Sequence, residues 1–104
     1  MEFLMTFERV YNERIFHEGK RKSVIRMVRW NRERPYLERR EFHLGDDGVT
    51  WIPKKAKGFT EADMAIVDAN REKIDLDFEA AKHARGNGAL KVSLAEISAA
   101  LSPK

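Results

Sequence analysis

The stretch from Ser23 to Thr60 constrains the fold more than any other part of this chain. It contains two runs that alternate as β-strands do, residues 23–30 and 36–44, joined by a short polar connection that ends in Pro35. In both runs apolar and aromatic residues are interleaved with arginine, so neither face would be uniformly polar. We therefore expect a sheet with one face packed on a helix and the other meeting a partner or ligand.

Two further segments extend this predicted sheet. The alternation of apolar residues after Phe3 predicts one long or bulged strand that ends before His17, followed by a turn at Gly19. Residues 49–52 give a short fourth strand or the arm of a loop, because Pro53 argues against a long central strand.

Helical signals follow the strands. Thr60 is a good N-cap, with Asp63 as the acidic partner of a capping box, and an apolar stripe predicts a helix from about 61 to 73. A second helix is expected over 78–85, and Ser93 starts a short one whose apolar residues are Leu94, Ile97 and Leu101. These elements predict the α+β class, with strands followed by an amphipathic helix and then by a helical C-terminal extension over 75–104.

The composition allows one domain and excludes several classes of site. The chain has 104 residues and no cysteine, so disulfides and thiolate metal sites are not available. No apolar run approaches the roughly 20 residues of a membrane span, and the N-terminus does not resemble a signal peptide. We expect a cytoplasmic protein, associated with the nucleoid if it is bacterial.

The charge is distributed unevenly. Residues 1–58 carry 14 lysines and arginines against 9 acidic residues, whereas residues 59–104 carry 6 against 8. The predicted sheet therefore has a net charge of +5 and the predicted helical part −2. One basic face on an otherwise balanced protein is typical of a polyanion binder, although a solvated charged surface gives the same pattern.

Cations and rings alternate in the predicted sheet in a way that suits single-stranded nucleic acid. Trp30 could stack on a base, and neighbouring arginines could neutralise phosphates; these are Arg26, Arg29, Arg32, Arg34 and Arg40. The alternatives are burial for the rings, which is favoured for Tyr36 and Phe42, and cross-strand ion pairs with Glu33, Glu38 and Glu41 for the arginines. The lysines at 54, 55 and 57 could clamp phosphate near the helix start or simply be solvated.

The order of these residues resembles the transcriptional positive cofactor four family, in particular its bacterial members. The matching motifs are Trp30-Asn31, Arg34-Pro35, Leu37-Glu38-x-Arg40-Glu41-Phe42 and Lys57-Gly58-Phe59-Thr60, and they cover about residues 7–74. The resemblance implies a four-stranded antiparallel sheet followed by an amphipathic helix (ββββα) in a domain of residues 1–74. It also implies a homodimer whose curved sheets bind single-stranded DNA, and to a lesser degree RNA, with little sequence preference. The contacts that it implies are Trp30, Arg32, Arg34, Arg40 and Phe42, with Lys54, Lys55 and Lys57 on the approach to the helix.

Two residues depart from the family pattern. Arg39 stands where the family prefers an aliphatic residue, and we expect it to pair with a carboxylate. Trp51 is an additional ring in the loop before the helix, and the resemblance assigns it no role.

Two other classes of function stay open at this point. A small basic ribonuclease of the toxin type would use His43, Glu41, Arg40 and Tyr36 as general acid–base groups. A protein-interaction module would use the C-terminal extension. The histidines lack metal-ligand spacing, and no cofactor motif is visible, so we expect a non-catalytic binder without cofactor or metal.

Overall fold

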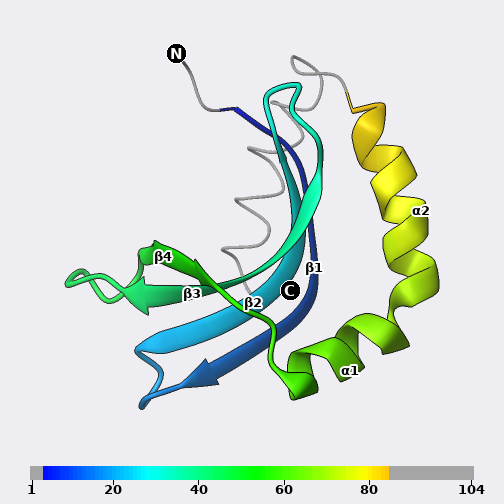
Figure 1. Ribbon diagram of the computed structural model, residues 1–104. Helices are drawn as coiled ribbons and strands as arrows, with labels where there is room; N and C mark the ends of the chain where they lie inside the picture. The colour runs from blue at the N-terminus through cyan, green and yellow to red at the C-terminus, as the bar shows by residue number, and fades with distance from the viewer. Residues whose placement is uncertain (1–3, 85–104) are drawn as a thin grey trace.

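The computed structural model describes residues 4–84, which form one antiparallel sheet followed by two helices (Figure 1). The elements are β1 (Met5–Phe16), β2 (Arg21–Trp30), β3 (Tyr36–Leu44), β4 (Trp51–Lys57), α1 (Glu61–Ala69) and α2 (Arg71–Lys82). The strands lie side by side in chain order, so β1 and β4 are the two edges. The predicted four-stranded antiparallel sheet followed by helix is therefore confirmed. Among residues 4–84, no helix has the length and apolar character needed to span a bilayer.

A tight turn joins β1 to β2, as the sequence predicts. Glu18 and Gly19 have φ values of 55° and 82°, and the Lys20 N–H donates to the His17 carbonyl at 3.0 Å. Positive φ at both central residues is the geometry that matches the twist of two antiparallel strands. β1 itself is one long strand with two register irregularities, which confirms the expected long or bulged strand.

The core lies between the sheet and the two helices, which cover the convex side of the curved sheet (Figure 1). From β2, Ile25 and Met27 pack against Val67 of α1 and against Ile74 and Ala81 of α2. We call this side of the sheet the helix face. Side chains alternate along a strand, so the next residues of β2 point the other way, onto what we call the concave face: Lys22, Val24, Arg26, Val28 and Trp30.

The helical part differs from the single helix expected over 61–73. The capping box at Thr60 is confirmed: the Asp63 N–H donates to the Thr60 hydroxyl at 3.1 Å, and the Asp63 carboxylate accepts the Thr60 N–H at 2.9 Å. α1 ends at Asn70, whose φ and ψ of −108° and 14° depart from helical values and whose side-chain amide donates to the Ile66 carbonyl at 2.8 Å. A second helix, α2, begins at Arg71 and continues past residue 74, where the predicted domain ends and the C-terminal extension begins. The predictions for residues 85–104 lie outside the described residues.

β4 begins and ends later than the predicted strand over 49–52. Pro53 lies inside it, opposite Phe42, while Ala56 is opposite Arg40, so β4 carries extra residues at this point. An edge strand pairs on one side only, and a bulge there leaves residues unpaired, so proline is tolerated. The sequence argument against a central strand was correct, but it did not exclude a bulged edge strand.

Candidate nucleic-acid interface

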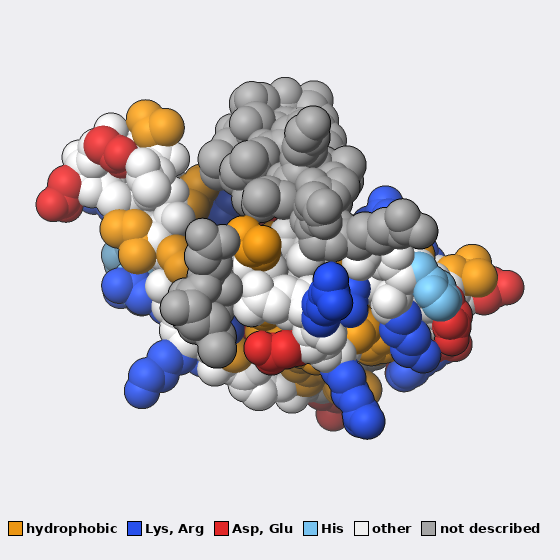
Figure 2. Space-filling view, turned by 90° about the horizontal axis from the view of Figure 1, so that it is seen from above, with side chains coloured by type: hydrophobic (Ala, Val, Ile, Leu, Met, Phe, Trp, Pro, Cys, Tyr) orange, Lys and Arg blue, Asp and Glu red, His pale blue; other side chains and the backbone are white. Residues whose placement is uncertain are grey.

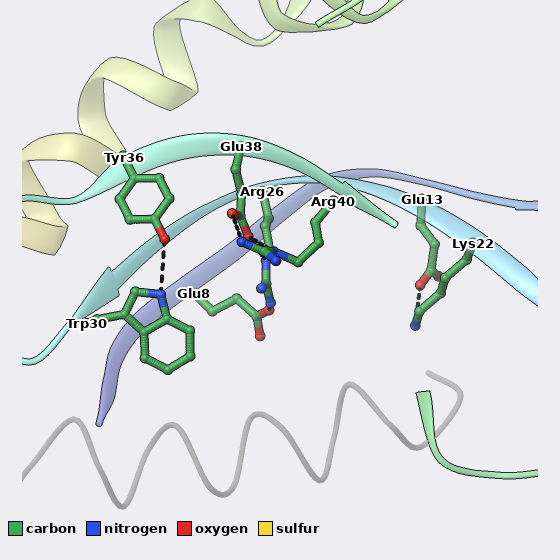
Figure 3. A network of polar contacts seen from close by, with 8 residues as sticks. All are labelled: Glu8, Glu13, Lys22, Arg26, Trp30, Tyr36, Glu38 and Arg40. Atoms are coloured by element: carbon green, nitrogen blue, oxygen red, sulfur yellow. Dashed lines mark hydrogen bonds and ion pairs between the residues drawn. The ribbon is translucent and has the colours of Figure 1, made fainter. Parts of the chain in front are cut away.

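Four of the predicted contact residues share the concave face. Arg26 is directly opposite Glu38, Val28 is opposite Tyr36, and Lys22 is opposite Phe42. Directly paired residues of antiparallel strands point to the same side. Arg26, Trp30, Arg40 and Phe42 therefore lie on one face. Figure 3 shows the first three on the side of the strands away from α1 and α2, the two arginines with carboxylate partners and Trp30 with Tyr36.

The centre of the concave face is a closed network of charges (Figure 3). The Arg26 guanidinium is 2.8 Å from a Glu38 oxygen and 2.5 Å from a Glu8 oxygen, and the Arg40 guanidinium is 2.9 Å from the other Glu38 oxygen. Burial would raise the pKa of Glu38, but hydrogen bonds from Arg40 and Arg26 hold this pKa below its ordinary value. Two cations thus meet two carboxylates, as the ion-pair alternative predicted for Glu38. Either arginine would reach a phosphate only by exchanging a carboxylate for it.

The centre is also shielded from water. Arg26 and Glu38 are only 6% and 5% exposed, and Val24 and Val28 beside them are buried as well. The concave face is therefore not uniformly open to solvent along β2 and β3. Its more exposed side chains lie at the two ends.

Trp30 and Tyr36 form the first end. The Trp30 indole N–H donates to the Tyr36 hydroxyl at 3.2 Å (Figure 3). Trp30 is partly buried, and Tyr36 is 41% exposed. The expectation that Tyr36 belongs to the core is wrong, because its strand position places it on the concave face opposite Val28.

Phe42 lies at the opposite end, with Lys22 and Trp51. The Lys22 ammonium is 5.5 Å from the centre of the Phe42 ring and 4.7 Å from that of Trp51. It also lies 2.9 Å from a Glu13 oxygen (Figure 3). Both rings are partly buried. Phe42 is thus on the concave face and not part of the core between sheet and helices.

Arg32 and Arg34 lie on the turn that follows Trp30. Both side chains are exposed and have no hydrogen-bond or ion-pair partner among the residues that the structure describes. They line an open pocket between this turn and α2, which also contains Phe78. The two arginines therefore follow Trp30 in the chain and line a pocket on the helix side of the turn. The pocket also contains acidic side chains, Glu33, Asp75 and Glu79.

The fifth arginine of the predicted set, Arg29, has a structural role. Its guanidinium donates to the carbonyls of Ala81 and Ala84 at the end of α2, at 3.2 and 2.7 Å, and to the Glu33 carbonyl at 2.8 Å. A cation at a helix C-terminus is stabilised by the helix dipole. Arg29 thus ties the β2–β3 turn to α2.

The three predicted lysines lie on the edge strand β4. Lys54, Lys55 and Lys57 are exposed, and their ammonium groups have no partner within residues 4–84. The Lys54 carbonyl accepts a hydrogen bond from Arg40, which fixes β4 to β3 at the bulge. Figure 2 shows that Lys and Arg side chains are spread over several separate parts of the face seen from above.

Arg39 pairs with a carboxylate, as expected. It points to the helix face, where its guanidinium is 2.8 Å from an Asp63 oxygen and donates to the Ser23 hydroxyl at 3.2 Å. Its main partner is thus Asp63, the acidic residue of the capping box of α1. A strand glutamate, Glu41, lies farther away at 4.0 Å. This arginine joins the sheet to the helix.

The ribonuclease candidates do not converge on one site. Tyr36 and Arg40 lie on the concave face, whereas Glu41 and His43 point to the opposite side, next to Ser23 and Arg21 in the sheet register. Desolvation and the nearby Arg21 lower the pKa of His43. Within residues 4–84, no group of three or more histidine and acidic side chains could hold a metal ion.

Sequence reasoning missed three charged members of the concave face: Glu8, Glu13 and Lys22. The alternation of β2 would have placed Lys22 on this face if the predicted strand had begun before Ser23. The two glutamates could not be placed, because a register shift between Val10 and Asn12 changes which residues of β1 face which way.

Comparison of the chain with family models, with curated proteins and with solved structures finds no match. The resemblance to the positive cofactor four family therefore rests on the short motifs of the sequence alone.

Proposed function

We propose that this protein is a non-catalytic binder of single-stranded DNA, and secondarily of RNA, that acts in the cytoplasm in transcription regulation or DNA maintenance. The observation that carries the proposal is the first end of the concave face, where a partly exposed tryptophan–tyrosine pair is followed in the chain by a turn with two exposed arginines that have no partners among the described residues. Rings that can stack on unpaired bases, beside cations that can follow the backbone, are the combination that single-strand binders use.

The mechanism follows from how these groups are placed. Arg32 and Arg34 attract the phosphates, as do the β4 lysines at the far edge of the sheet. The Trp30–Tyr36 pair then offers a flat surface to a base that is not already stacked in a duplex. Neither interaction distinguishes one base from another, because every base has a stacking face and every nucleotide a phosphate.

A homodimer belongs to the same proposal. The outer edge of β1 carries no partner strand within the described residues, and the exposed apolar side chains of Val10 and Ile15 lie on this strand, 43% and 57% exposed. Pairing with a second copy would cover such an edge. Light scattering of the purified protein tests this: a mass of one chain would contradict it.

The proposal is tested by titrating a labelled oligo(dT) of about 12 nucleotides with the protein and following fluorescence anisotropy. Stacking one base contributes on the order of 1–3 kcal/mol, so Trp30→Ala should weaken binding by about 5- to 150-fold. Trp30→Phe is the matched control, because it keeps a ring and should retain most of the affinity. An unchanged affinity in a folded Trp30→Ala protein would remove Trp30 from the interface.

A further inference from the structure

We infer that Phe42 and Trp51 form a second stacking site, so that a bound strand is held at both ends of the concave face. This inference rests on the proposed function, and it predicts how long a bound strand must be to reach both ends. Trp51 is the ring for which the family resemblance has no role, and the structure places it beside Phe42 through the register of β3 and β4, with Lys22 over both rings.

The two ends are chemically alike. Each has two aromatic side chains contributed by different strands: Trp30 and Tyr36 come from β2 and β3, and Phe42 and Trp51 from β3 and β4. Each is partly open to solvent. At the second end the Lys22 ammonium lies over both rings while it pairs with Glu13, and the exposed Lys54 follows Trp51 on the same strand.

The region between the two ends contributes little to binding. Arg26 is buried and paired with Glu8 and Glu38, and Arg40 is partly buried and paired with Glu38. Affinity should therefore come from two separate points and not from a continuous track. Lys22 and Trp30 are eight residues apart on β2, and at about 3.3 Å per residue this is about 26 Å. A stacked strand rises about 3.4 Å per nucleotide, so about eight nucleotides would connect the ends.

The chain contains two tryptophans, one at each end, so each end has its own reporter. In a Trp30→Phe protein the emission comes from Trp51, and in a Trp51→Phe protein it comes from Trp30. Oligo(dT) of about 12 nucleotides should quench both variants over the same concentration range, because stacked bases quench indole emission at either site. Quenching of Trp30 without any quenching of Trp51 would overturn the second site and leave the proposed function standing.

Oligonucleotide length gives an independent readout. Binding to the wild type should tighten steeply between about 3 and 12 nucleotides, and Trp51→Ala should remove on the order of tenfold from the affinity for the longer strand only. Trp51→Phe keeps a ring and controls for folding of β4. Equal loss for both lengths would contradict the two-ended arrangement. Absence of binding to any length by the wild type would refute the proposed function, and this inference with it.

Discussion

The salt dependence of oligonucleotide binding can be calculated from the number of cations that the structure leaves available for phosphates. The proposed interface has five cations without partners among the described residues: Arg32, Arg34, Lys54, Lys55 and Lys57. Each phosphate neutralised on a single strand contributes about −0.7 to the slope of log K against log salt concentration. If each cation meets one phosphate, the slope is about −3.5. Counting Arg26 and Arg40 as well would give about −4.9, but their carboxylate partners argue against including them.

The double variant Arg32→Ala/Arg34→Ala should lower the slope to about −2.1, since two of five contacts are lost. Between about 50 and 200 mM salt, wild-type affinity should fall by about 100-fold and that of the variant by about 20-fold. Anisotropy titrations of oligo(dT) at four or more salt concentrations measure both slopes. Arg71→Ala is a suitable control, because this exposed arginine pairs with Asp68 on the helical side.

An unaltered slope in the double variant would show that the turn arginines contact no phosphate. A wild-type slope near zero would refute the electrostatic part of the mechanism altogether.

Three further predictions concern the charge network and the core. Glu38→Gln should free Arg40 for phosphate, while Arg26 keeps its ion pair with Glu8, so oligo(dT) should bind more tightly and with a steeper salt dependence; weaker binding with an unchanged slope would contradict this. The pKa of Glu38 is lowered in the folded protein, so its ionised form stabilises the fold. This contribution to stability is fully present above the ordinary carboxyl pKa of about 4.3, and it is lost as the pH falls through the lower pKa of the folded state. Acid unfolding followed by circular dichroism should accordingly be less steep in Glu38→Gln than in the wild type, and identical pH profiles would exclude Glu38 as a contributor. Tyr11→Phe should lower the free energy of unfolding by about 1–3 kcal/mol, because the Tyr11 hydroxyl donates to the buried Asp77 carboxylate at 2.7 Å; a urea titration that gives an unchanged value would refute this.

The division of β2 into two faces could be predicted from the sequence. Alternation within Ser23–Trp30 separates Ile25 and Met27 from Arg26 and Trp30, and the structure shows that Ile25 and Met27 are the residues packed against the helices. The start of α1 could be predicted equally well, because Thr60 and Asp63 carry the whole capping box within four residues. These predictions succeeded because they depend on neighbours in the chain.

What failed depends on contacts between distant residues or on backbone irregularities. No local pattern shows that Asn70 ends one helix and starts the next, or that a register shift in β1 brings Glu8 to Arg26. Such pairings decide which cations stay available. As a result, the sequence placed Arg26 and Arg40 among the phosphate contacts, whereas the structure gives both of them carboxylate partners.

The central claim is that the partly exposed rings and the cations without partners bind unpaired strands. The most direct measurement compares the affinity of the wild-type protein for oligo(dT) of about 12 nucleotides with that for a duplex of equal length, at one salt concentration. The account predicts saturable binding of the single strand and much weaker binding of the duplex, whose bases are already stacked. Equal affinity for the two, or no binding of the single strand, would contradict it.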